Sequence, residues 1–335
     1  MIKSQEKLEG ISIIRTVSMI AIMLYHIGYG HYYLQNIYFQ SSVHLFFCIS
    51  AFLIMYTTET KTANTFLKKR LIRIVPLYVL LTIFTFIASK FISSFSQGDI
   101  GIPELIKSIL FIPYERSGLK SDSAVRPIVG PGWTLYFDIW FAFIFFIAMK
   151  IKHKHRGIIA ALICIGVTVL GIFLPQELPI ARLLCTGFLL SFVTGIAVFY
   201  LWRFFFQNKK NKFSHMWEVS GVLLLILFYC LPMNLFLQIA ATPLILVCVL
   251  VSTHQRPVAK VFTRFADVSF SFYLLHYYVI LVVGKFINFT QLNLKTILGT
   301  VIVFFLALIA SICSYIVIEK KLGNALQGLL ERYFK

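Results

Sequence analysis

An all-α integral membrane bundle of about ten membrane-spanning helices is the fold class that this sequence predicts. Three observations lead to it. The chain has 335 residues, of which 59% are hydrophobic and 13% charged, with a mean hydropathy of +0.84. It divides into apolar runs that are each long enough to cross a bilayer as a helix. The basic residues gather in alternate segments between these runs, as in multi-span membrane proteins.

The spans are expected in chain order near residues 11–29, 41–58, 75–93, 132–149, 157–174, 180–201, 215–231, 233–252, 267–286 and 296–318. A tight Leu231-Pro232-Met233-Asn234 turn separates the seventh span from the eighth. The outer loop of about 94–131 is much longer than the others, and loops of this length are often functional. Within it, GIPELIKSILFI predicts a short amphipathic helix on the outer face.

The charge pattern orients the spans and places both termini in the cytoplasm. The inner segments then hold most of the basic residues: Lys3, Lys7, Lys61, Lys68, Lys69, Arg70, Arg73, Lys150, Lys152, Lys154, Arg156, Arg203, Lys209, Lys210, Lys212, Arg256, Lys260, Arg264, Lys320, Lys321, Arg332 and Lys335. The outer loops hold Lys107, Arg116, Lys120, Arg126, Lys285 and Lys295. Because the net charge of +18 is spread over inner segments, it indicates no nucleic-acid-binding domain.

The six cysteines all fall in apolar runs, and none belongs to a CxxC pair. They are interpreted as small core or lipid-facing residues, with no disulfide framework and no metal site. The first apolar run lacks a small-residue cleavage site and contains Arg15, so it is not expected to be a removable signal peptide.

The first span carries two ionisable residues, Arg15 and His26. They are eleven residues apart, which is three helical turns plus roughly 20°, so both side chains lie on one face about 16 Å apart along the axis. Met19 and Ile22 fill that face between them. Cations inside membrane helices usually turn toward protein or water and mark functional sites. The alternative is that Arg15 snorkels to the headgroups while His26 anchors the opposite interface.

Other spans contain further polar groups. The second opens with His44, and the fourth contains Asp138, the only carboxylate placed well inside a span. In the ninth, Ser269, Tyr273 and His276 follow i, i+4, i+7 spacing and share a face. These residues either line one polar path through the bundle or are satisfied separately by neighbouring helices.

A basic cluster, FLKKRLIRIVPLY, lies between the second and third spans and is expected in an inner loop. Its cations are Lys68, Lys69, Arg70 and Arg73. Such a cluster binds lipid phosphates or a polyanionic ligand, or it serves only the positive-inside bias. The sequence contains no Gly-rich phosphate loop and no metal-ligand spacing.

Six stretches together resemble the membrane acyltransferase-3 family, whose members O-acylate bacterial surface polysaccharides and related glycans. Arg15 and His26 reproduce its Arg-x10-His pattern, and the other matching stretches are LFFCISAFLI, FLKKRLIRIVPLY, GPGWTLYFDIWF, SFSFYLLH and YIVIEKKLGNAL. The matches run in order from residue 8 to residue 326. The sequence departs from the family pattern at His44 (usually Asp or Pro), Ala51 (Gly), Asp138 (Glu) and Lys321 (Pro), and it ends without the soluble SGNH-type domain of some members.

The resemblance implies a single acyltransferase domain over residues 1–335 in the bacterial inner membrane. It implies a cytoplasmic acyl-CoA donor, most often acetyl-CoA, a glycan or lipid-linked sugar as acceptor, and no metal. His26 is then expected to be the general base or an acyl carrier, with Arg15 holding the donor. Asp138 or His276 would orient an imidazole or bind the sugar, Trp133 would stack on a sugar ring, and Arg70 and Arg73 would guide CoA. Tyr273, Ser269 and His44 complete the expected binding residues.

Two alternatives remain open from the sequence. A transporter or flippase of a glycan or lipid-linked sugar would use the same polar path without covalent chemistry. A non-catalytic subunit of a polysaccharide synthase would not depend on His26.

Overall fold

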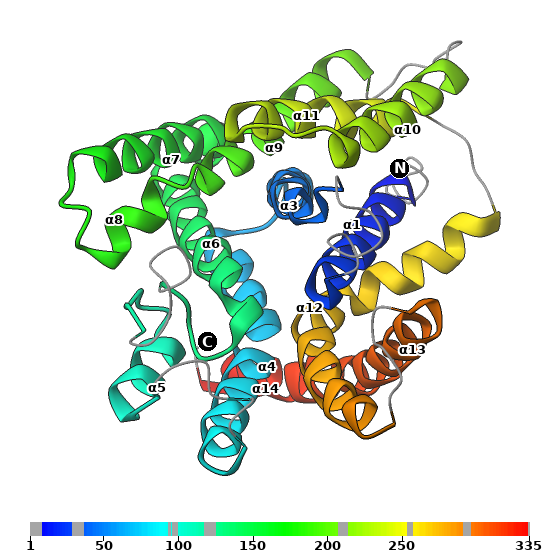
Figure 1. Cartoon of the computed structure of the whole chain (residues 1–335). Coiled ribbons are helices and arrows are strands. Elements are labelled where there is room, and N and C mark those ends of the chain that lie inside the picture. Colours follow the sequence, from blue (N-terminus) through cyan, green and yellow to red (C-terminus); the bar gives the residue numbers. More distant parts are fainter. Residues whose placement is uncertain are drawn as a thin grey trace. The chain divides into compact units, whose positions relative to one another are not determined.

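The computed structural model describes residues 9–28, 37–92, 95, 100–116, 125–206, 214–252, 257–290 and 296–333 (Figure 1). Within these ranges the chain is helical and contains no β-strand. The nearest approach to one is an isolated antiparallel bridge between Glu115 and Val125. The all-α prediction is therefore confirmed.

The helices fall into two compact units, each described here by itself. Unit 1 (Met1–Thr60, Gly187–Phe270 and Leu294–Thr300) contains α1 (Glu9–Ile27), η2 (Phe39–Ser41), α3 (Ser42–Thr57), α9 (Phe188–Leu201), η7 (Trp202–Phe206), α10 (Ser214–Cys230) and α11 (Leu235–Val251). Unit 2 (Lys61–Thr186, Ser271–Asn293 and Val301–Lys335) contains α4 (Ala63–Phe91), α5 (Ile102–Ile109), η5 (Gly130–Gly132), α6 (Trp133–Lys152), η6 (His153–His155), α7 (Arg156–Phe173), α8 (Pro179–Leu184), η8 (Tyr315–Leu322) and α14 (Gly323–Tyr333). Both units share α12 (Pro257–Thr290) and α13 (Ile297–Ser314).

Seven helical segments of the described chain are long and apolar enough to cross a membrane. Two shorter apolar helices, α10 and α11, accompany them. Every predicted span overlaps at least one helix, and the chain is a multi-pass membrane protein. The count of ten and the cytoplasmic termini stay predictions. Several of the basic residues used to orient the spans lie outside the described residues: Lys3, Lys7, Lys120, Lys209, Lys210, Lys212, Arg256, Lys295 and Lys335.

Unit 1 is built around the close contact of α3 and α9 (Figure 1). Gly195 makes this approach possible, because a Cβ at this position would lie 2.1 Å from the carbonyl oxygen of Cys48 and 2.8 Å from Cβ of Ala51. Small residues at helix interfaces allow backbones to pack closely where no hydrophobic effect drives association. Helices α1 and α11 also pack against α3 in this unit.

Unit 2 is organised around α4 and α6, which contact each other, while α5, η8 and α14 pack against α4. The core at this contact is aromatic, since Tyr78, Tyr136, Phe137, Phe141 and Phe145 are fully buried. The segment η8 is a π-helix, a wide turn type that often occurs at functional sites.

The basic cluster was expected in a loop, and this prediction was wrong. Lys68, Lys69, Arg70 and Arg73 all lie on α4, which begins at Ala63. The Thr62 side chain caps the helix by accepting a hydrogen bond from the Thr65 amide, and the Leu, Lys and Arg residues that follow are good helix formers. Pro76 lies inside α4 without ending it. The arginines are therefore held on a rigid helix.

Two local predictions of secondary structure are confirmed. GIPELIKSILFI contains a helix, α5, in which the Glu104 carboxylate accepts from the Gly101 amide at 2.9 Å, while its place on the outer face stays a prediction. The turn at Leu231–Asn234 separates α10 from α11, and the Asn234 side chain caps α11 by accepting from the Leu237 amide at 2.9 Å.

Candidate active site

Helix α1 carries Arg15 and His26 in unit 1. It runs without a break from Glu9 to Ile27, so the eleven-residue spacing places both residues on one helical face. Met19 and Ile22, which lie between them, are 1% and 3% exposed. His26 is in the last turn of α1, where the rings of Tyr25 and His26 meet edge to face at 5.4 Å.

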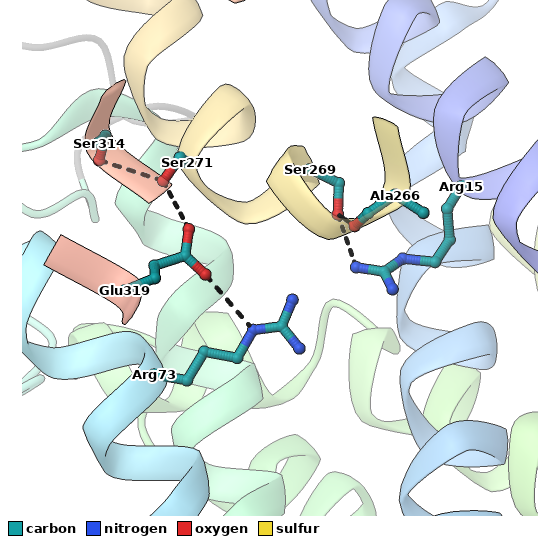
Figure 2. Close-up of polar contacts among 7 residues, drawn as sticks. All are labelled: Arg15, Arg73, Ala266, Ser269, Ser271, Ser314 and Glu319. Atoms are coloured by element: carbon teal, nitrogen blue, oxygen red, sulfur yellow. Dashed lines mark hydrogen bonds and ion pairs between the residues drawn. The ribbon is translucent and has the colours of Figure 1, made fainter. Parts of the chain in front are cut away.

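Arg15 is tied to α12 by a short hydrogen bond. Its Nη2 atom donates to Oγ of Ser269 at 2.6 Å, and the Ser269 hydroxyl donates to the carbonyl oxygen of Ala266 at 2.7 Å (Figure 2). Ser269 is 3% exposed. The structure thus brings together two of the predicted site residues that are far apart in the sequence.

His44 lies in the first turn of α3 and is buried at 4% exposure. Its Nδ1 atom lies 2.8 Å from Oγ of Ser191, and its ring stacks on Phe188 with centroids 4.6 Å apart. Both contacts come from α9 and strengthen the α3–α9 interface. These contacts give His44 a packing role at this interface, and its binding role stays a prediction.

Arg70 and Asp138 form an ion pair in unit 2, between α4 and α6. Nη2 of Arg70 lies 2.6 Å from Oδ1 of Asp138, and the two side chains are 17% and 18% exposed. A charge-assisted contact of this length is strong, and each member neutralises the other in a setting where a lone charge is costly. Two residues predicted for separate roles are thus direct partners.

Arg73, one helical turn further along α4, faces a carboxylate that the sequence analysis did not single out. Its Nε atom lies 3.9 Å from Oε2 of Glu319 on η8 (Figure 2). Ser271 donates to Oε1 of Glu319 at 2.5 Å and lies 3.1 Å from Oγ of Ser314. The Glu319 side chain is 7% exposed, whereas that of Arg73 is 42% exposed. The signal for Glu319 was present in the closing motif YIVIEKKLGNAL.

Tyr273 connects α12 to the start of α6. The Tyr273 hydroxyl donates to the carbonyl oxygen of Pro131 at 3.0 Å and accepts from Oγ1 of Thr134 at 2.9 Å. This fixes the turn that carries Trp133, whose ring meets Phe137 edge to face at 6.2 Å. Tyr273 and Trp133, both predicted binding residues, therefore adjoin the same helix end.

His276 is 1% exposed, and its Nδ1 atom lies 3.0 Å from the carbonyl oxygen of Phe272 on its own helix. Ser269, Tyr273 and His276 all lie on α12, as predicted. Ser269 belongs to unit 1, whereas Tyr273 and His276 belong to unit 2.

The arrangement offers acid–base and anion-binding chemistry. The imidazole of a histidine can take up and release a proton, and the arginines supply fixed positive charge for phosphates or a developing oxyanion. Among the described residues no group of three His, Cys, Asp or Glu side chains is arranged to hold a metal ion.

The sequence of the chain also matches a known protein family. The sequence model of the acyltransferase-3 family, described as an acyltransferase domain, matches residues 8–316. This range includes α1 with Arg15 and His26, both arginines of α4, Asp138 and the whole of α12. No curated protein and no solved structure matches the chain.

Proposed function

The chain belongs to the acyltransferase-3 family and is a membrane acyltransferase, and on this premise we propose its donor, acceptor and catalytic residues. It moves an acyl group, in the first instance acetyl, from cytoplasmic acyl-CoA to a hydroxyl of a cell-surface or lipid-linked glycan. It acts in the bacterial inner membrane. The observation that carries the assignment of the site is α1, where one unbroken helix places a histidine and an arginine on the same face.

The reaction needs a base for the hydroxyl proton and a cation or donor for the charge that develops on the carbonyl oxygen. In this proposal His26 takes the proton while the hydroxyl oxygen forms an ester bond to the acyl carbon. The thioester C–S bond breaks, and the proton passes from His26 to the departing CoA thiolate. An acyl-histidine formed at His26 before the hydroxyl attacks is the second route to the same products.

Arg15 is the residue of α1 proposed to hold the donor. The bond to Ser269 fixes its guanidinium in place, and a preorganised planar fork binds phosphate or carbonyl oxygens without loss of side-chain entropy. The role of Ser269 is then to position Arg15.

On α4, Arg73 is better suited to CoA phosphates than Arg70. Arg73 is 42% exposed and lies 3.9 Å from its carboxylate, whereas Arg70 is 17% exposed and is engaged at 2.6 Å. We therefore assign phosphate binding to Arg73 and charge compensation to the pair of Arg70 and Asp138. Trp133, beside the Tyr273 contact, is assigned to stack on a sugar ring of the acceptor, and His276 to orient a neighbouring polar group.

The test is transfer of label from acyl-CoA. Membranes that contain the protein, and matched membranes that lack it, receive acetyl-CoA labelled in the acetyl group. The glycan and lipid-linked sugar fractions are then analysed by mass spectrometry. The expected result is a mass gain of one acetyl group per modified sugar only where the protein is present. Glycan that crosses the membrane without any mass gain or CoA dependence would identify a transporter and overturn the proposal.

A further inference from the structure

Arg116 lies in the long loop between α4 and α6, in a short extended segment. The segment is fixed by the bridge between Glu115 and Val125. Successive side chains of an extended chain point to opposite sides. Accordingly, the Glu115 side chain is 51% exposed and pairs with Arg182 at 2.8 Å, whereas Arg116 is only 2% exposed. The carboxylate next to Arg116 in the sequence is therefore engaged elsewhere.

The buried guanidinium of Arg116 uses only part of its hydrogen-bonding capacity. Nη1 donates to the carbonyl oxygen of Pro127 at 3.2 Å, while Nε and Nη2 have no hydrogen-bond partner among the described residues. Burial lowers the pKa of Arg116, and the phenols of Tyr114, Tyr277 and Tyr136 act in the opposite direction. An arginine nevertheless stays a cation at neutral pH. Unmatched donors on a buried cation are costly, so their presence calls for an acceptor that binds there.

The surroundings of Arg116 favour an anion. Tyr136 is fully buried, and in the part of the chain that the structure describes its hydroxyl also has no hydrogen-bond partner. A second cation, Arg126, lies close enough for its charge to act on Arg116 and on Tyr273. The hydroxyl of Tyr114, by contrast, lies 2.9 Å from Oγ of Ser108. Nε and Nη2 form the side of the guanidinium fork that binds two oxygens of one carboxylate or phosphate.

We propose that Arg116, with the Tyr136 hydroxyl and the charge of Arg126, forms a binding subsite for an oxyanion carried by the acceptor. The oxyanion is a carboxylate of an acidic sugar or the phosphate that links a sugar to its carrier. The existence of the anion site rests on these contacts alone, and its assignment to the acceptor rests on the proposed function.

The experiment measures binding to the full-length protein in detergent, without acyl transfer. Three probes are compared by thermal unfolding at constant ionic strength: glucuronic acid, glucose 1-phosphate and, as the neutral control, glucose. The expected result is a concentration-dependent rise in Tm with at least one anionic sugar and none with glucose. The probe that binds identifies the oxyanion as carboxylate or phosphate.

Variants then locate the site. Arg116→Gln is expected to weaken binding of the anionic probe by about 10- to 100-fold, because a hydrogen-bonded charge is lost. Arg116→Lys keeps the charge but not the fork and should bind with intermediate affinity. Tyr136→Phe removes one oxygen and should weaken binding by less. Arg182→Gln removes a nearby arginine that is already paired with Glu115, and it should bind the probe like the parent.

Each rise in Tm is measured against the same variant without probe, so a change in basal stability does not enter the result. If Arg116→Gln does not fold, Tyr136→Phe still tests the site. Absence of a response to both anionic sugars, or an equal response in the parent and in the folded variants, would overturn the subsite. This experiment does not measure acyl transfer. If the protein binds the anionic sugar here but transfers no acetyl group in the labelled acetyl-CoA experiment, the proposed function alone is contradicted.

Discussion

Arg15 in unit 1 and the two arginines of α4 in unit 2 are held by different kinds of partner. In unit 1, Arg15 donates to a neutral serine hydroxyl, Ser269. In unit 2, Arg70 and Arg73 each face a carboxylate, Asp138 and Glu319. A hydroxyl positions a guanidinium and leaves its charge unchanged, whereas a carboxylate cancels that charge while it positions the group. Loss of the partner should therefore have different consequences in the two units.

The largest effect is expected at His26, on the helix that carries Arg15. His26→Ala should lower acyl transfer by about 10²–10⁴-fold, the usual effect of losing a general base. The amount of protein in the membrane should not fall, because removing one polar group does not oppose insertion. His26→Gln keeps a hydrogen-bonding side chain without the base and should be nearly as inactive.

The measurement for His26 is glycan acylation normalised to membrane protein. If His26→Ala acylates as well as the parent, His26 only anchors the helix at the interface. The general base would then not lie on α1, and the proposed role of Arg15 in holding the donor would also lose its support.

The next effect concerns stability in unit 2. Asp138→Asn leaves Arg70 without its carboxylate, and breaking a buried ion pair from one side costs about 3–5 kcal/mol. Since both side chains keep some exposure, we expect a value of about 3 kcal/mol. The double variant Arg70→Gln/Asp138→Asn removes both charges and should lose less. Unfolding in detergent gives the free energy of unfolding of the parent and of both variants. An Asp138→Asn variant as stable as the parent would show that Asp138 does not compensate the charge of Arg70.

Two serines on α12 sharpen the comparison, because they are two residues apart and belong to different units. Ser271→Ala removes a donor to the carboxylate of Glu319 and should cost about 1.5–3 kcal/mol. Ser269→Ala removes the hydroxyl that accepts from the charged guanidinium of Arg15 and should cost a similar amount, about 1.5–3 kcal/mol. The same unfolding assay compares both variants with Asp138→Asn. A loss at Ser269→Ala larger than that of Asp138→Asn would show that a hydroxyl partner matters as much as a carboxylate partner.

The smallest effect is expected at the pair of Arg203 and Glu59 in unit 1. Their side chains are 53% and 35% exposed. Exposed ion pairs are worth about 0–1 kcal/mol, so Glu59→Gln should change stability by less than about 1 kcal/mol. This variant serves as the control for Asp138→Asn, since it also removes a carboxylate from an arginine. If Glu59→Gln lost as much stability as Asp138→Asn, the difference in burial would not explain how much each ion pair stabilises the protein.

The class of fold and the α1 geometry followed from the sequence because both depend on local patterns, namely apolar runs and an eleven-residue spacing. The bounds of α4 did not follow, because the four cations were placed in an inner loop, while the Thr62 cap and the helix formers after it favoured an earlier start. The pairs formed by Arg70 with Asp138 and by Arg73 with Glu319 join residues far apart in the chain. A single sequence does not show which distant side chains meet in the folded protein, although it does show the motifs to which these four residues belong.

Arg116 shows the same limit in another way. In the sequence it is one basic residue of a long polar loop. Its burial depends on the extended segment that sends Glu115 outward to Arg182, and this arrangement appears only once the loop is folded.

The position of Glu319 within the π-helix η8 makes this segment sensitive to changes in its number of residues. Removing one residue from a helix rotates everything that follows relative to what precedes it, by about 100° in an α-helix and by somewhat less in the wider π-helix. Glu319 lies within η8, where its carboxylate meets both Arg73 and Ser271. Many single replacements on the exposed side of η8 would leave these contacts in place, but a single deletion between Tyr315 and Glu319 would swing the carboxylate away from one or both partners. Sequences that keep this site are therefore expected to vary in composition across η8 while they preserve the number of residues in it.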